Sequence, residues 1–385
     1  MKKTLLISLF FFVVSWCGAQ VLPRYGADTT AREPLPAKWR VVWQLETENG
    51  GMIHNNKQVR EDLNDIYYNG INLKVGWQTE RGGDLYHQRY HYPIYGIGFY
   101  ASTFRKKEIG TPTALYGFVA IPIAPGRFRR WDFNYRISLG MASNFVPFDE
   151  VNNPNNILLG SHRTVFIDLG AQANYRLGKR FQLGTGLAFH HFSNGSIKLP
   201  NKGINLIPLT FALTYHPGRR QPDFSKNADA PKENDIAHHL HYSFGIKQFT
   251  PGGRRYFKST VGFYGSRSFG YKWRLGLGGD LFYSDSGRYP AVAGDSKGKF
   301  NTLFSGGPAF YIDHVLTKQL YLNGNVGLYL NRHAFNGEVS PVFLRIGVRY
   351  KIFRKYYTGV SIKAHMGKAD FVEWTLGRTW LRKAK

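Results

Sequence analysis

The residues with the clearest potential for chemistry are His191 and Ser193, which lie two positions apart at the end of an alternating stretch. Side chains two positions apart in a β-strand point to the same face, because successive side chains alternate. The other members of that face are apolar, apart from one threonine: Leu183, Thr185, Leu187 and Phe189. A serine beside a histidine on an apolar strand face predicts an enzyme that cuts acyl chains from membrane lipid.

A serine hydroxyl becomes a good nucleophile when a base accepts its proton, and the base works best when a third group orients it. If residues 203–216 pair with residues 180–193, Asn205 lies on the same face as His191, and its carbonyl can accept the imidazole N–H. Asn194 follows the serine and could donate its amide N–H to a developing oxyanion. The alternative is an ordinary Ser-Asn-Gly turn with an interfacial histidine. Three polar residues on otherwise apolar faces favour a site, because polar groups facing hydrocarbon are costly.

Two lysines of the following loop, Lys198 and Lys202, could meet lipid phosphates, although a solvated loop charge is an equally good interpretation of each. The sequence lacks Cys/His metal spacing and phosphate-binding glycine loops, so no metal or nucleotide cofactor is implied. Its only cysteine, Cys17, lies in the N-terminal apolar run.

The composition favours an all-β membrane protein. The chain has 24 tyrosines, 29 phenylalanines and 43 glycines, yet its mean hydropathy is −0.34. Segments of about ten alternating residues recur from residue 39 onward, for example Ile71, Leu73, Val75 and Trp77 against polar or small neighbours. This is the signature of a transmembrane antiparallel β-barrel of the outer membrane, with an apolar outside and a polar inside.

The chain divides into five expected parts. Residues 1–19 are typical of a secretory signal peptide and 20–38 of a periplasmic tail. Residues 39–217 and 237–385 each contain about eight predicted strands, and 218–236 form a polar connector. We expect one barrel of about sixteen strands, and the alternative is two eight-stranded units.

The formal net charge of +26 calls for an anionic partner. Nucleic acid is not expected, because no recognition motif or basic low-complexity arm is present. Phosphorylated lipid at a membrane surface fits better, although some of the Lys and Arg side chains must simply line the lumen and the loops.

One stretch resembles a known family. Residues 191–205, His-Phe-Ser-Asn-Gly-Ser-Ile-Lys-Leu-Pro-Asn-Lys-Gly-Ile-Asn, are similar to the active-site stretch of the PagL-type lipid A 3-O-deacylases, or acyloxyacyl hydrolases. The wider pattern resembles the longer Bacteroidetes-type members, and it includes Gly50-Gly51-Met-Ile-His54, Trp77-Gln78-Thr79 and Tyr92-Pro93. The resemblance covers about residues 40–217.

The resemblance implies an outer-membrane β-barrel that hydrolyses an ester-linked acyl chain of lipopolysaccharide. It implies Ser193 as nucleophile, His191 as base and Asn194 as oxyanion donor. The sequence departs from the family at the third catalytic residue, because Asn205 stands where the family pattern has Glu. We therefore expect an outer-membrane serine esterase that acts on lipid A. The alternatives are a catalytically inactive lipopolysaccharide-binding barrel and a porin-like channel.

Overall fold

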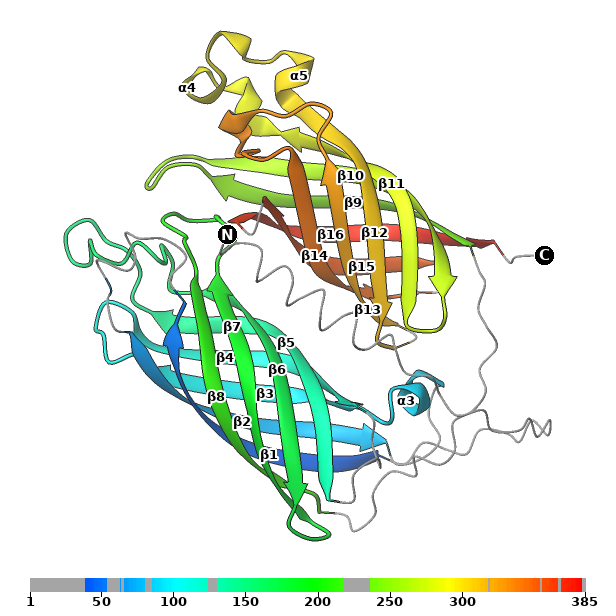
Figure 1. Ribbon diagram of the computed structural model, residues 1–385. Coiled ribbons are helices and arrows are strands. Elements are labelled where there is room, and N and C mark those ends of the chain that lie inside the picture. Colours follow the sequence, from blue (N-terminus) through cyan, green and yellow to red (C-terminus); the bar gives the residue numbers. More distant parts are fainter. Residues whose placement is uncertain are drawn as a thin grey trace. The chain divides into compact units, whose positions relative to one another are not determined.

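The protein is described from a computed structural model, in which almost all regular structure is β-strand (Figure 1). The described parts of the chain are residues 39–53, 63, 66–79, 85–123, 130–217, 236–317, 319–353, 355–365 and 368–382. The predicted signal peptide, the periplasmic tail and nearly all of the polar connector lie outside the described residues.

The first barrel is a closed ring of eight antiparallel strands. Each strand pairs with its neighbours in chain order, and β1 also pairs with β8, which closes the ring. A short helix, α3 (Leu85–Arg89), precedes β3. The strands are β1 (Trp39–Met52), β2 (Tyr67–Thr79), β3 (Ile94–Thr103), β4 (Gly110–Ile123), β5 (Trp131–Phe145), β6 (Thr164–Arg176), β7 (Phe181–Ser193) and β8 (Ile204–Tyr215).

The second barrel is also a closed ring of eight antiparallel strands, completed by the pairing of β9 with β16. Its strands are β9 (Ile236–Gln248), β10 (Arg255–Phe269), β11 (Trp273–Ser284), β12 (Phe304–Val315), β13 (Leu320–Leu328), β14 (Val342–Lys351), β15 (Tyr356–His365) and β16 (Lys368–Arg382). Short helical turns occupy two of its loops: η1 (Asp285–Arg288), α4 (Pro290–Ala293), η2 (Gly294–Ser296), α5 (Phe300–Leu303) and η3 (Ala334–Asn336).

The predicted all-β antiparallel barrel class is confirmed, and so is the total of sixteen strands. The prediction that they form one barrel is wrong, and the alternative of two eight-stranded units is what the structure shows. The reason is that the free edge of β1 is satisfied by β8, from Trp43 opposite Tyr215 to Met52 opposite Leu206. With both edges of the first sheet paired, no edge is left for β9.

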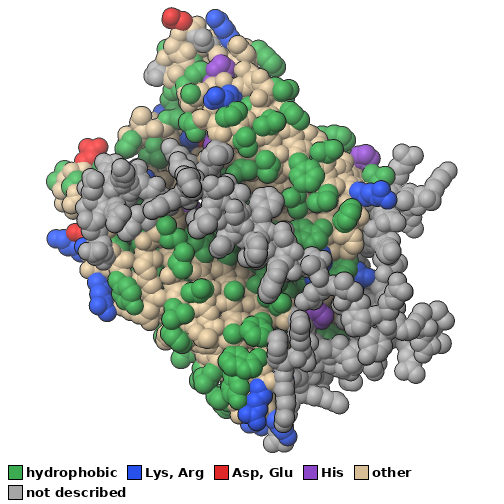
Figure 2. Space-filling view, in the orientation of Figure 1, with side chains coloured by type: hydrophobic (Ala, Val, Ile, Leu, Met, Phe, Trp, Pro, Cys, Tyr) green, Lys and Arg blue, Asp and Glu red, His purple; other side chains and the backbone are tan. Residues whose placement is uncertain are grey.

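The outer walls of both barrels are apolar. On β7 the alternation predicted from sequence is observed, since Leu183 and Leu187 are exposed whereas Gly184, Ala188 and His190 are buried. Figure 2 shows hydrophobic side chains spread over the visible face of the strands. Among the described residues, no helix combines the length and apolarity needed to cross a membrane.

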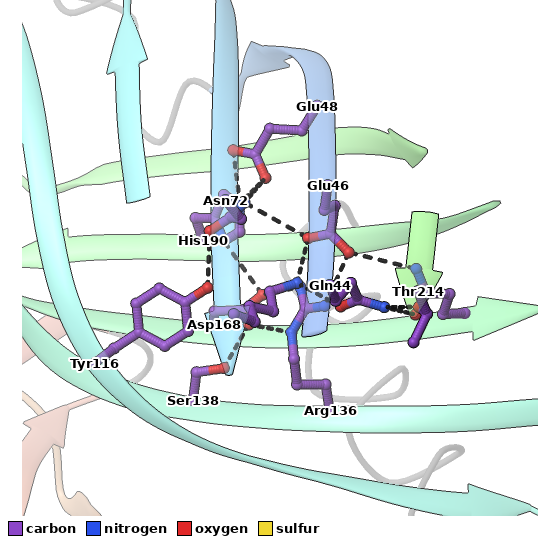
Figure 3. Close-up of polar contacts among 12 residues, drawn as sticks. Gln44, Glu46, Glu48, Asn72, Tyr116, Arg136, Ser138, Asp168, His190 and Thr214 are labelled. Carbon is purple, nitrogen blue, oxygen red and sulfur yellow. Dashed lines mark hydrogen bonds and ion pairs between the residues drawn. The ribbon is translucent and has the colours of Figure 1, made fainter. Parts of the chain in front are cut away.

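The lumen of the first barrel contains a network of paired charges (Figure 3). Glu46 forms ion pairs with Lys74 at 2.6 Å and with Arg136 at 3.1 Å, and Arg136 also binds Asp168 at 2.7 Å. His190 lies 3.0 Å from the carboxylate of Glu48. All are almost fully buried, and buried charges are tolerated only when they are paired. The network therefore occupies one level of the lumen, and a buried hydrophobic cluster that includes Tyr100, Phe166 and Phe192 packs next to it.

The second barrel uses the same chemistry on different strands. Arg345 of β14 binds Glu373 of β16 at 2.6 Å and Asp280 of β11 at 3.1 Å. Asp280 also faces His241 of β9 at 3.4 Å. Both lumens thus contain a buried arginine held between two carboxylates.

Candidate active site

The predicted pairing of β7 with β8 is confirmed, and it places His191 directly opposite Asn205. The His191 Nδ1 atom lies 2.6 Å from the Asn205 carbonyl oxygen, Oδ1. Because a carbonyl oxygen can only accept, this contact assigns the proton to Nδ1. The other ring nitrogen, Nε2, is then the unprotonated one that can accept a proton from a serine.

Ser193 is the last residue of β7, and it is buried. Its Oγ accepts two hydrogen bonds, from the Gly195 backbone N–H at 3.1 Å and from the Asn201 side-chain amide at 2.9 Å. Within the described residues, His191 and Ser193 share no hydrogen bond. The role of His191 as the base for Ser193 stays a prediction, and catalytic hydrogen bonds often form fully only when substrate binds.

Gly203 is the last residue of the loop that follows Ser193, and it lies beside both His191 and Ser193. A Cβ atom at this position would lie 3.2 Å from His191 Cε1 and 3.8 Å from Ser193 Cβ. Its φ of +73° is also unfavourable for residues with a side chain. Glycine at this position therefore lets the loop backbone pass directly beside both candidate catalytic side chains.

The side chain of Asn194 is already engaged. Its amide donates to Ser161 Oγ and to the Lys198 carbonyl, each at 2.8 Å, and its backbone N–H donates to Asn201 Oδ1 at 3.0 Å. An amide group has two hydrogens, and both are used within these loops. The role of Asn194 as oxyanion donor stays a prediction, and in this geometry Asn201 and the Gly195 N–H are better placed beside the nucleophile.

Asn201 is the site residue that sequence reasoning missed. It links the loop to the nucleophile, since its oxygen accepts from Asn194 while its nitrogen donates to Ser193. A β-bridge with Leu159 fixes its backbone. Asn201 belongs to the stretch 191–205 that resembles the family. Its contact with Ser193 could not be predicted, because it depends on the path of the loop.

A second loop, residues 146–163, supports the first. Asn156 is fully buried at its centre and donates to the carbonyls of Glu108 and Val146 at 2.9 and 2.6 Å. Its own Oδ1 accepts the backbone N–H groups of Leu158 and Leu159. The Leu158 carbonyl then accepts the N–H of Gly203 at 3.1 Å. One buried amide therefore connects the barrel rim with the loop that holds the serine.

The start of that loop is a tight turn closed by Asp149. The backbone N–H of Asn152, followed by that of Val151, donates to the carboxylate and holds the pKa of Asp149 below its usual value. The turn therefore keeps its hydrogen bonds at neutral pH, where the carboxylate is charged.

The structure places Lys198 and Lys202 in the serine loop but in different environments. Lys198 is exposed, and its backbone carbonyl is the acceptor for Asn194. Lys202 is half-buried. A contact of either with lipid phosphate stays a prediction.

An apolar groove of about 450 Å³ lies on the outer wall of the first barrel. Its lining includes Leu183 and Thr185 of β7, Leu213 of β8 and Leu45 of β1. Leu183 and Thr185 lie on the same face of β7 as the candidate catalytic histidine and serine. The groove lies at the start of β7 and Ser193 at its end, so the groove and the candidate site are at opposite ends of the same strand.

No metal site accompanies these residues. Across the described ranges, no group of three or more His, Cys, Asp or Glu side chains could hold a metal ion.

Comparison with family models gives two matches. Residues 71–214 match the family described as lipid A 3-O-deacylase (PagL). Residues 236–383 match the C-terminal domain of acyloxyacyl hydrolase. Together the two matches span most of the chain, one for each barrel. No curated protein matches this sequence.

Three of the solved structures that match are distant in sequence. The outer membrane enzyme PagL matches with 13% identity and a TM-score of 0.32, covering 44% of this chain and 97% of that chain. Neisserial surface protein A matches with 10% identity and a TM-score of 0.30, covering 46% and 96%. A Rh. blastica porin mutant matches with 8% identity and a TM-score of 0.17, covering 89% and 100%.

Proposed function

Because the chain belongs to the lipid A 3-O-deacylase (PagL) family, with the acyloxyacyl hydrolase C-terminal domain, we propose that it is an outer-membrane esterase acting on lipid A. The reaction is hydrolysis of an ester-linked acyl chain. The observation that supports it most is the 2.6 Å contact between His191 and Asn205 on the outer wall, next to a serine that accepts two N–H donors.

The proposed reaction starts with the transfer of the Ser193 proton to His191 Nε2. The serine oxygen attacks the ester carbonyl, and the resulting oxyanion is bound by N–H donors close to Ser193. Gly195 and Asn201 are the nearest candidates, with Asn194 as the donor predicted from sequence. His191 then returns the proton to the leaving sugar oxygen, which breaks the C–O bond and leaves an acyl-serine.

The second half reaction uses water. His191 accepts a proton from the water as its oxygen attacks the acyl-serine, and the same N–H donors bind the second oxyanion. The proton returns to Ser193 as the fatty acid leaves. The substrate ester approaches from the lipid, so its acyl chain can lie along the apolar outer wall next to β7.

Asn205 takes the place of the family glutamate in this scheme. Its carbonyl holds the Nδ1–H tautomer of His191, which is the orienting role of the third residue. It lacks the charge that would stabilise the imidazolium. We therefore propose a working but slower site than one with a carboxylate at this position.

The porin-like alternative is less well supported than the esterase. The side chains that meet in the first lumen, including Glu46, Lys74 and Arg136, are buried and bonded to one another. A water-filled channel needs an open path, and this network blocks the ring at its level. An inactive lipopolysaccharide-binding barrel is the stronger rival, because loss of the family glutamate favours it.

The test is mass spectrometry of lipid A from cells that produce the wild type, Ser193→Ala or His191→Ala. We expect one acyl mass to be lost only with the wild type. Thr185→Ala is the matched control, because it removes an exposed hydroxyl from the same face of β7. Unchanged lipid A with a folded, membrane-inserted wild type would leave the binding function in place of the esterase.

A further inference from the structure

The long-loop end of the second barrel combines exposed cations with a line of outward aromatic rings. This end is defined by the 285–303 and 329–341 connections, where α4 and α5 lie (Figure 1). Outer-membrane barrels place their long loops on the extracellular side and their short turns on the periplasmic side. The end therefore faces the outer leaflet and its headgroups.

The aromatic line runs across three neighbouring strands into the first of these loops. Phe257 of β10 contacts Tyr283 of β11 at 6.5 Å between ring centroids, and Tyr283 contacts Phe304 of β12 at 5.4 Å. Phe300 of α5 stacks on Phe304 at 4.7 Å and is 73% exposed. Aromatic rings at this level of a barrel mark the boundary between acyl chains and headgroups.

Exposed cations surround this aromatic line: Arg254, Arg255, Arg288, Lys297 and Lys299. Arg255 lies two residues from Phe257 on the same face of β10, and the Arg288 guanidinium lies 5.8 Å from the Tyr283 ring. Arg254 stacks over Tyr289 at 4.2 Å. These ring contacts hold two of the arginines at the level of the headgroups.

Acidic side chains do not neutralise this group. Arg288 makes only an exposed 3.6 Å pair with Asp285. Among the described residues, no carboxylate pairs with Arg254, Arg255, Lys297 or Lys299, and the same loop offers only Asp285 and Asp295. The surface therefore keeps a net positive charge just above an aromatic belt.

From this arrangement we propose that the extracellular rim of the second barrel binds the phosphate groups of an anionic outer-leaflet lipid. Arginine suits this partner because its planar donors match phosphate oxygens and it stacks on rings. The aromatic line anchors the acyl region below, and the cations bind the headgroup above. The rim would give the second barrel a lipid-holding role that does not use Ser193, and it rests on the proposed outer-membrane location.

The experiment measures binding of bisphosphorylated lipid A by the full chain in detergent micelles. All proteins carry Ser193→Ala, so the ligand stays intact whether or not the wild type is an esterase. We expect the triple variant Arg254→Gln, Arg255→Gln, Arg288→Gln to weaken binding by roughly tenfold to a hundredfold, because each cation near an anionic surface adds to affinity. Binding of the parent should weaken as salt is raised.

The matched control removes three basic residues from the opposite end of the same barrel: Arg267→Gln, Lys355→Gln and Arg378→Gln. This triple should bind like the parent. An equal loss in both triples would overturn the proposal, because it would show a general charge effect. Equal binding of dephosphorylated lipid A by the parent would also overturn it.

Two further measurements separate the remaining explanations. The double variant Lys297→Gln, Lys299→Gln leaves every ring contact in place and should also bind the lipid more weakly. It tests the proposal even if the arginine triple variant fails to fold. Inorganic phosphate should not displace the lipid when it is added at concentrations too low to change the ionic strength appreciably. Displacement would identify a free-phosphate site and overturn the lipid assignment.

Discussion

The two barrels share an architecture but differ on their outer walls. Each is a closed ring of eight antiparallel strands, and each lumen holds a buried arginine between two carboxylates. The lumen residues lie on different strands in the two rings, so the resemblance is one of chemistry and not of position. A buried arginine between two carboxylates, beside a cluster of buried aromatic rings, is therefore common to both lumens and does not by itself specify an activity.

The seventh strands of the two rings show where they differ. The outward positions at the end of β7 are His191 and Ser193, whereas those at the corresponding end of β15 are Ile362 and Ala364. The residue opposite His191 is Asn205, and the residue opposite Ile362 is Val372. Polar chemistry on the lipid side is thus confined to the first ring at these positions. We expect esterase activity to depend on the first barrel and to be indifferent to mild changes on the wall of the second.

The largest effect should come from removing the lumen arginines one at a time. Arg136→Leu leaves the carboxylates of Glu46 and Asp168 without their main partner, and breaking a buried pair in this way costs about 3–5 kcal/mol. Arg345→Leu should do the same to the second ring through Asp280 and Glu373. Hydrogen exchange followed by mass spectrometry resolves the two rings and should show faster exchange in the altered ring.

The comparison predicts that the two substitutions act separately. Arg136→Leu should also lower activity, because the altered ring holds β7, whereas Arg345→Leu should leave the catalytic constant within about twofold. Faster exchange in both rings from either substitution would show that the rings are one cooperative unit.

The next largest effect should come from Asn201→Ala. This change removes a donor to Ser193 Oγ, and loss of one oxyanion donor typically lowers kcat by about 10²- to 10³-fold. KM should change little if the interaction forms only in the transition state. Asn155→Ala is the matched control, since it removes an exposed asparagine side chain from the supporting loop. A normal kcat in Asn201→Ala would return the donor role to Asn194.

Much of the first barrel could be predicted because its signals are local. Strand alternation depends on neighbouring residues, so the outward set of β7 and the strand total followed from the pattern itself. The pairing of His191 with Asn205 followed because β7 and β8 are consecutive strands and the apolar faces of both must point outward, which restricts their register.

The remaining features depend on contacts between distant parts of the chain. Sixteen alternating strands give the same sequence pattern whether they close as one ring or as two. Only the pairing of β1 with β8 decides between the two arrangements. The contact between Asn201 and Ser193 depends on a bridge from Asn201 to Leu159, which lies in another loop. Single-sequence patterns contain no information on either contact.

A smaller effect is expected at Asn205, where this chain departs from its family. Asn205→Ala removes the oxygen that orients His191 and should lower kcat by about 10²-fold, the lower end of the contribution of a positioned general base. Asn205→Glu should raise kcat above the wild type, because a carboxylate also stabilises the imidazolium. Both are measured as initial rates on purified lipid A. A rate for Asn205→Glu below that of Asn205→Ala would show that the site is built around the neutral amide.

The smallest effect should come from Ser161, which touches the catalytic loop but not the reacting atoms. Its Oγ accepts from the Asn194 side chain and donates to the Arg163 carbonyl, each at 2.8 Å, and Ser161→Ala removes both bonds. The bond to Asn194, which is the one that reaches the catalytic loop, contributes about 1 kcal/mol. We expect kcat to fall about fivefold with KM unchanged, and the labelling rate of Ser193 by a fluorophosphonate to fall in the same proportion. Ser161→Thr keeps the hydroxyl and should restore both rates. If threonine failed to restore them, the loss would reflect general loosening of the loop, whereas restoration would assign Ser161 a positioning role through Asn194.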